Sequence, residues 1–232
     1  MLPVKLKTTP QQFFFCILAE NFKKIKVSTK ERKEIEKENR RKLILDAAVK
    51  VMQSHGLHGL SIDLIATETQ LAKGTIYLYF KSKEEILSVL SIKARNLLFA
   101  EFQKIEKSKS SDIEKLKDII RVDYQFYKKN PLNYDLVSLY EVNNKLTETE
   151  EMHQSGENIT NLIVGIANRA QANGTLNANI NPSILSMGLW GMSVGMLQLI
   201  KVRGAIMKEK LGISEKDLVN TFIEMLENGV KK

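Results

Sequence analysis

The sequence predicts an all-α protein, and three observations support this prediction. Apolar residues recur at intervals of three and four along most of the chain, which is the spacing of helices with one buried face. The 232 residues include four Pro and twelve Gly, without the regular alternation that marks β-strands. A hydrophobic content of 43% is enough for a substantial core.

The first 39 residues (1–39) are predicted to form an N-terminal extension, irregular over residues 1–26 and continuing as a charged, exposed helix. Its apolar stretch, Phe13–Ala19, is too short to cross a bilayer. The stretch follows Pro10 and lacks a small-residue cleavage site, so a signal peptide is not favoured. The sequence leaves open whether residues 1–26 belong to the functional protein.

Residues 40–94 are predicted to form a three-helix domain. The first helix begins near Arg40, and its apolar residues fall on one side: Leu43, Ile44, Ala47, Ala48, Val51 and Met52. Gly56 is suited to end this helix, because glycine readily adopts the left-handed conformation that follows a helix. Ser61 is expected to cap the second helix, which ends near Thr69.

A third helix is expected over residues 72–80, and Ser82 is expected to cap a fourth. Two short helices joined by a tight turn, after a longer supporting helix, form a helix-turn-helix. The second short helix of this motif enters the DNA major groove. Ile76 and Phe80 are expected in the core, and the candidate DNA contacts are Lys73, Gly74, Thr75, Tyr77, Tyr79 and Lys83.

The excess positive charge lies in the same part of the chain. Residues 1–95 contain 18 Lys and Arg against 10 Asp and Glu, whereas residues 96–232 contain 17 of each kind. Such asymmetry favours a polyanionic partner, either nucleic acid or an anionic membrane. A charged tail that serves only solubility is the alternative.

The segment "ILDAAVKVMQSHGLHGLSIDLIATETQLAKGTIYLYFKSKEEIL", Ile44 to Leu87, resembles the DNA-binding domain of TetR/AcrR-family transcriptional regulators. Its most specific part is "KGTIYLYFKSKEEIL". The resemblance implies that the candidate residues in this part contact an operator. The chain has Gln70 where the family usually has Gly, and Ala72 where it often has Ser. Gln70 must therefore adopt a turn conformation that Gly adopts more easily.

Residues 95–232 are predicted to form a second helical domain, which the resemblance implies binds a ligand and forms a homodimer. Gly188, Gly191 and Gly195 would let the penultimate helices of two copies approach closely. An apolar inducer is expected, because aromatic and Met side chains occur on the candidate pocket helices. The candidate ligand-binding residues are Tyr124, Tyr127, Met152 and Trp190, for each of which core packing is the alternative.

The sequence thus predicts a cytoplasmic, ligand-responsive transcriptional regulator, most simply a repressor. Its expected partners are double-stranded operator DNA, a small apolar inducer and a second copy of the chain, and no membrane. No enzyme activity, cofactor or metal is predicted, because the three His and single Cys lack metal-ligand spacing and no nucleotide-binding or nucleophile motif occurs. The alternative is a helical small-molecule-binding or membrane-surface protein without sequence-specific DNA binding.

Overall fold

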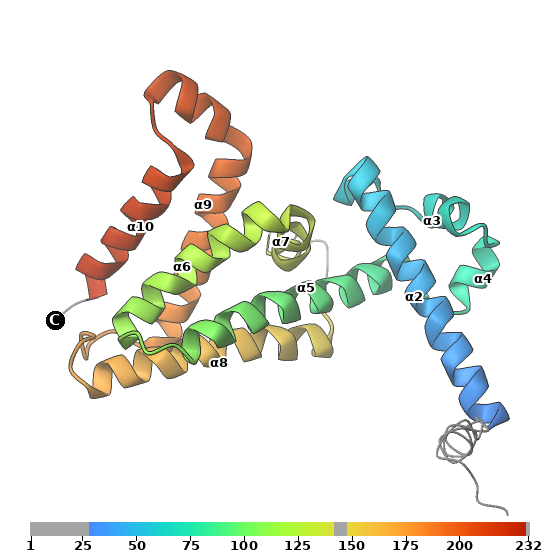
Figure 1. Cartoon of the computed structure of the whole chain (residues 1–232), viewed down its shortest axis with the longest axis horizontal. Coiled ribbons are helices and arrows are strands. Elements are labelled where there is room, and N and C mark those ends of the chain that lie inside the picture. Colours follow the sequence, from blue (N-terminus) through green and yellow to red (C-terminus); the bar gives the residue numbers. More distant parts are fainter. Residues whose placement is uncertain (1–27, 142–147, 231–232) are drawn as a thin grey trace, which may run out of the picture. The chain divides into compact units, whose positions relative to one another are not determined.

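The computed structural model describes residues 28–141 and 148–230, and every regular element within these ranges is a helix. The chain divides into two compact units between Leu43 and Ile44. The helices are α2 (Thr29–His55), α3 (Ile62–Thr69), α4 (Lys73–Tyr77), α5 (Lys83–Glu106), α6 (Asp112–Lys129), α7 (Pro131–Ser138), α8 (Glu150–Ala172), α9 (Pro182–Leu211) and α10 (Glu215–Val230), with a 3-10 turn, η1 (Leu57–Gly59), after α2 (Figure 1). The all-α prediction is confirmed.

Helix α2 combines the predicted charged helix and the first helix of the three-helix domain. Ser28 and Glu31 start it with a capping box: the Ser28 hydroxyl accepts from the Glu31 N–H, and the Glu31 carboxylate accepts from the Ser28 N–H. Residues 29–39 are exposed on all sides. The predicted apolar side is buried from Ile44 to Met52, but Leu43 is 42% exposed and does not belong to it.

The helix starts that the sequence predicts for α3 and α5 are present. The Ser61 hydroxyl accepts from the Leu64 N–H at 3.2 Å, and the Ser82 hydroxyl accepts from the Glu85 N–H at 3.2 Å. These bonds satisfy N–H groups that a helix start otherwise leaves without partners. Helices α3 and α4 pack together, and Ile65, Ile76, Phe80 and Ile86 are completely or almost completely buried.

Helix α4 ends at Tyr77, earlier than the expected end at residue 80. The next residues tighten into a 3-10 turn, because the Leu78 N–H donates to the Thr75 carbonyl and the Tyr79 N–H to the Ile76 carbonyl. The tighter turn changes the direction in which Leu78 and Tyr79 project. Side chains after Tyr77 therefore do not follow the spacing of a regular α-helix.

The other helices share one continuous core. Helix α5 packs on α6, α7 and α8, and α9 packs on α6, α8 and α10. The predicted domain boundary between residues 94 and 95 falls inside α5, which continues without a break. The core between these helices includes the buried side chains of Leu98, Phe102, Leu116, Ile120, Ile166 and Leu197.

The starts of the last three helices follow local signals. Pro182 opens α9, as the sequence predicts because proline suits the first position of a helix. Ser214 and Asp217, the start signal that the sequence offers for the last helix, form a reciprocal capping box at α10. Helix α8 is capped by Thr149, whose hydroxyl accepts from the Met152 N–H at 3.3 Å. The sequence pattern of Thr147 followed by Glu150 predicts a capping box here, but Thr147 lies outside the described residues.

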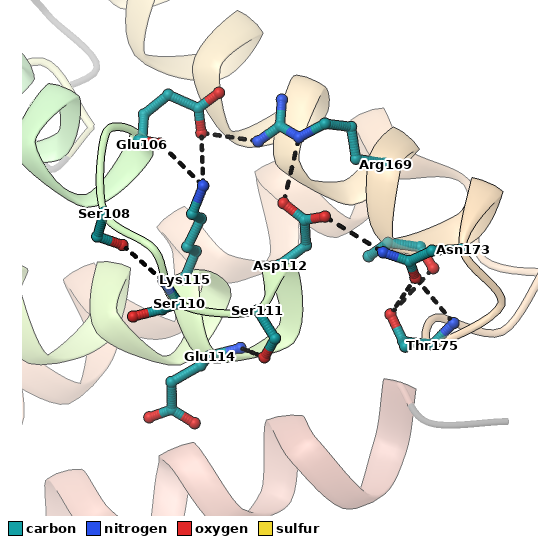
Figure 2. A network of polar contacts seen from close by, with 11 residues as sticks. Glu106, Ser108, Ser110, Ser111, Asp112, Glu114, Lys115, Arg169, Asn173 and Thr175 are labelled. Carbon is teal, nitrogen blue, oxygen red and sulfur yellow. Dashed lines mark hydrogen bonds and ion pairs between the residues drawn. The ribbon is translucent and has the colours of Figure 1, made fainter.

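A polar network ties the end of α5 to the start of α6 and the end of α8 (Figure 2). Arg169 lies at its centre, 2.8 Å from the Glu106 carboxylate and 3.2 Å from the Asp112 carboxylate. The Lys115 ammonium donates to the Glu106 backbone carbonyl at 2.8 Å. Because Arg169 is partly exposed, each ion pair adds little stability, but together they fix where the three helix ends meet.

Candidate functional site

The turn between α3 and α4 depends on an unusual backbone conformation at Gln70. Its φ of 55° and ψ of 29° place it in the left-handed helical region, and Gln70 is the only non-glycine residue with positive φ in the described part of the chain. The Gln70 and Leu71 N–H groups donate back to the Thr67 and Ala66 carbonyls, which ends α3. The expectation that Gln70 adopts a glycine-like conformation is confirmed.

Gln70→Gly should stabilise the protein by about 0.5–1 kcal/mol. The left-handed conformation costs an L-residue roughly 1–2 kcal/mol, which glycine avoids, although glycine also loses more backbone entropy on folding. Urea unfolding of both proteins at equal concentration measures the difference. Gln125→Gly, at an exposed position inside α6, is the control and should be destabilising. A destabilised Gln70→Gly variant would contradict this account of the turn.

In α4 and the residues that follow it, the predicted core residues are buried, and the candidate DNA contacts are exposed or half-buried. Ile76 and Phe80 are buried, as predicted. Lys73, Gly74 and Tyr77 are exposed, and Tyr77 shows 52% of its surface. The candidates Thr75, Tyr79 and Lys83 are half-buried, so each has a limited surface available to a ligand.

The Lys73 ammonium pairs with the Asp63 carboxylate of α3. This hydrogen bond raises the pKa of Lys73, and the attraction between the two charges adds to the effect. Both side chains are exposed, so the pair is weak. A phosphate that approached Lys73 would therefore compete with Asp63.

Leu78 is a surface residue that the sequence analysis did not select. It is 80% exposed, the highest value among the large apolar side chains described. It directly follows the exposed Tyr77. Helical spacing does not predict its exposure, because α4 ends at Tyr77 and Leu78 lies in the turn that follows.

Lys83 opens α5 immediately after the Ser82 cap. The first N–H groups of a helix and its dipole favour an anion at this place. The Glu85 carboxylate accepts from the Lys81 N–H at 2.6 Å, which fixes the chain that enters the helix. Lys83 is thus the first residue of a well-ordered helix of 24 residues.

A cavity of about 240 Å³ lies among α5, α7, α8 and α9. Its apolar lining includes Val137, Ile159, Ile163 and Trp190. Its polar lining includes Arg95, Glu141, Glu148, His153, Glu157, Thr160 and Ser186. The lining therefore joins apolar and charged surfaces, as an amphipathic ligand requires.

Of the four predicted ligand-binding residues, only Trp190 lines this cavity. The Tyr124 hydroxyl donates to the Glu215 carboxylate at 2.9 Å, and the Tyr127 ring packs edge-on against Tyr134. The Met152 side chain is completely buried in the core. Arg95, by contrast, was not selected from the sequence, because an isolated arginine in a helical run resembles a solvent-exposed residue.

Helix α9 carries an exposed apolar face. Ile184, Met187, Val202 and Ile206 lie on it, and Met187 is 72% exposed. The three glycines predicted to allow close helix approach lie between them, and a Cβ added at Gly188, Gly191 or Gly195 would meet no atom within 4 Å. Met196, the residue after Gly195, is buried and does not belong to this face. This face is suited to contact with another apolar surface.

Among the described residues, α9 is also the helix that is long and apolar enough to cross a membrane by length and composition. A third of the most apolar stretch of α9 is buried within the protein. Buried residues such as Leu189, Leu197 and Ile200 contribute to its apolar character because they belong to the core. Core helices of soluble proteins have the same length and apolar composition.

Helix α3, the turn at Gln70 and the exposed helix α4 have the arrangement of a helix-turn-helix, the motif whose second helix enters the DNA major groove. Residues 44–90 match the model of the bacterial regulatory proteins of the tetR family. This segment belongs to the TetR family.

Curated relatives agree with this assignment. The chain is 39% identical over 77 residues to the fatty acid metabolism regulator protein of Bacillus subtilis, covering 33% of this chain and 40% of the relative. It is 30% identical over 98 residues to an uncharacterized HTH-type transcriptional regulator of Haemophilus influenzae, covering 42% and 52%. The matches thus span about two-fifths to one-half of these relatives.

Solved structures extend the similarity of fold to most of the chain. The transcriptional regulator FadR from Bacillus subtilis, in complex with stearoyl-CoA, has a TM-score of 0.62 at 22% identity, covering 81% of this chain and 98% of that one. AibR, in complex with isovaleryl coenzyme A and operator DNA, has a TM-score of 0.58 at 16% identity, covering 80% and 97%. At these identities the similarity concerns the fold.

Proposed function

We propose that this protein is a cytoplasmic, dimeric transcriptional regulator, most simply a repressor, that a small molecule releases from its operator. The observation that carries the proposal is a TetR-family helix-turn-helix, followed in the same chain by a helical bundle with a cavity of about 240 Å³. The proposed domains are the predicted ones: an extension (1–39), a DNA-binding domain (40–94) and a ligand-binding and dimerisation domain (95–232). No enzyme activity or cofactor is part of the proposal.

The proposed DNA contacts are the six residues predicted from the sequence. Lys73 and Gly74 would lie at the entrance of the groove, and the exposed Tyr77 would pack against sugar and phosphate. Thr75 would reach base edges, Tyr79 a phosphate oxygen, and Lys83 a phosphate at the start of α5. Leu78 adds an apolar surface that suits a thymine methyl group.

Lys83→Ala should weaken binding to every duplex by about the same factor and lower the salt slope by roughly 1, because one phosphate contact is lost. Fluorescence anisotropy at four salt concentrations, with several duplex sequences, measures both quantities. Lys93→Ala, an exposed lysine later in α5, is the matched control and should change neither. An unchanged slope for Lys83→Ala would remove Lys83 from the interface.

The proposed dimer forms through α9 and α10. The exposed apolar face of α9 needs a partner, and α10 adds the exposed Met225. A helix-turn-helix normally reads two half-sites through a two-fold dimer. A membrane-spanning α9 would have to leave the core that Leu197 and Ile200 share with the other helices.

The proposed ligand occupies the cavity that Trp190 lines. Its apolar body would lie against Val137, Ile159 and Ile163. Helix α5 contributes Arg95 to this cavity and Lys83 to the proposed DNA surface, so a single helix joins the two sites. The two related structures named above hold acyl-CoA thioesters in complexes, which is consistent with effector binding in this fold.

Reciprocal titration tests the proposal. A ligand that acts through the cavity should weaken operator binding roughly 5–150-fold, which corresponds to a coupling of about 1–3 kcal/mol. Thermodynamic linkage requires operator DNA to weaken ligand binding by the same factor. Ligands that bind the cavity tightly and leave DNA affinity unchanged would contradict the proposed release mechanism.

A further inference from the structure

The cavity carries more negative than positive groups. Three carboxylates line it, those of Glu141, Glu148 and Glu157, against the single guanidinium of Arg95. Arg95 comes from α5, Glu141 from the chain after α7, Glu148 from the chain just before α8, and Glu157 from α8 itself. The α9 side contributes the uncharged Ser186 and Trp190. The formal charge of the described lining, with His153 neutral, therefore favours a cation.

Arg95 is already engaged with the protein. Its side chain is 6% exposed, and its Nη1 donates to the Met152 carbonyl at 2.9 Å. Its Nη2 pairs with the Glu148 carboxylate, whose other oxygen lies 3.3 Å from His153 Nδ1. An anion that entered the cavity would have to compete with Glu148 for this guanidinium while it approached two further carboxylates.

The two other carboxylates have capacity for a partner. Glu141 Oε1 lies 3.9 Å from Arg95 Nη2, at the limit of an ion pair. Glu157 makes no hydrogen bond or ion pair with the residues that the structure describes, and it is exposed at the mouth of the cavity. The Trp190 ring adds a surface that attracts a cation through its π-electrons.

We propose that the ligand of this cavity is an amphipathic cation. Its ammonium or similar group would lie close to Glu141 and Glu157, and its apolar body against Trp190 and Ile159. This proposal rests on the proposed function, since it names the chemistry of the same effector. The proposed ligand differs in charge from those of the related regulators, whose structures hold acyl-CoA thioesters with several negative charges.

The same chemistry offers a route to α5. A cation that draws Glu141 or Glu148 toward itself weakens the contact of Arg95 with the chain after α7 or with the chain just before α8. Arg95 lies twelve residues after Lys83, which is about 18 Å along a continuous helix. The ligand would thus act on the helix that begins at the proposed phosphate contact.

The test uses three compounds with one carbon skeleton: 4-phenylbutylamine, 4-phenylbutanol and 4-phenylbutyrate. Trp190 is the single tryptophan of the chain, so its fluorescence reports occupancy of the cavity directly. At pH 7 the amine should bind at least about tenfold more tightly than the carboxylate, with the alcohol between them, because like charges repel in a partly desolvated site.

Variants identify the groups responsible. The double variant Glu141→Gln with Glu157→Gln keeps the shape of both side chains and should bring the amine and the carboxylate within about threefold of each other. Its affinity for the alcohol should stay unchanged. Glu224→Gln, at an exposed position of α10, should keep the full preference. Thermal unfolding of each variant verifies that the fold is retained.

Equal or tighter binding of 4-phenylbutyrate would overturn the proposal, and so would a preference for the amine that survives in the double variant. Absence of any fluorescence change with millimolar 4-phenylbutylamine would overturn it as well. Operator binding is measured on the same samples without ligand. Retained operator binding in these cases would leave the DNA-binding part of the proposed function intact, whereas its loss would count against that function alone.

Discussion

Gly191→Leu is expected to convert the dimer to monomers and to lower operator affinity about 10²–10⁴-fold. A Cβ added at this exposed position meets no atom within 4 Å in a single copy of the chain, so we expect the folded monomer to accommodate Leu. In the proposed dimer, the same side chain would enter the space of the partner's α9. The loss in affinity is large because two linked half-sites bind far more tightly than one.

Sedimentation velocity of both proteins at matched concentration measures the dimer, and operator titration measures the affinity. Gly165→Leu is the matched control, since Gly165 lies within α8 and an added Cβ would meet only the flexible end of Arg169. Both substitutions raise helix propensity, so neither should lower the unfolding temperature. A wild-type protein that sediments as a monomer would contradict the proposed interface outright.

Asp123→Asn is expected to stabilise the protein strongly above pH 7 and only weakly near pH 4. Asp123 lies on α6 and is 1% exposed. Its Oδ1 has no hydrogen-bond partner among the described residues, and the nearby Tyr134 hydroxyl is also buried without one. Burial raises the pKa of Asp123 from 3.8 to about 7, although a hydrogen bond with Ser193 opposes the shift.

The sign of the effect follows from proton linkage. Between pH 3.8 and about 7 the unfolded chain releases the Asp123 proton while the folded protein keeps it. Wild-type stability therefore falls as pH rises through this range, by roughly 4 kcal/mol in total, and levels off above it. Asn carries no charge in either state, so this decline should disappear in the variant.

Urea unfolding at pH 5 and pH 8, at one protein concentration, measures the difference between the two proteins. Asp46→Asn, at an exposed position of α2, is the control and should follow the wild-type pH dependence. If the curves for wild type and Asp123→Asn stay parallel between pH 5 and pH 8, Asp123 does not hold a proton in the folded protein.

Local sequence signals predicted the helix starts well. Ser61, Ser82, Pro182 and Ser214 act within three residues of themselves, through hydrogen bonds or backbone geometry. The unusual turn at Gln70 was foreseen for the same reason, since the resemblance located the position and its backbone demand. The sequence analysis was wrong about Leu43, which is exposed, and about the end of α4, which comes three residues early. The spacing of apolar residues does not reveal which of them a neighbouring helix covers, or where an α-helix changes to a 3-10 turn.

The cavity could not be built from local signals. Arg95 meets Glu148 and Met152 across more than fifty residues of sequence, and only packing of α5 on α8 brings them together. Aromatic content drew attention to Tyr124, but its hydroxyl binds Glu215 of α10. Trp190 is the one predicted ligand-binding residue that lines the cavity. It is large and lies beside small residues on α9, which packs against several other helices. Charge in the lining was therefore the property that the sequence analysis missed.

The central claim is that this chain reads a specific DNA sequence as a dimer. Selection of bound duplexes from a random pool, with the full-length protein at physiological salt, tests it most directly. We expect enrichment of an inverted repeat whose half-site centres lie about 10–10.5 base pairs, or a multiple of this, apart. A pool that shows no enriched sequence after repeated rounds would contradict the claim.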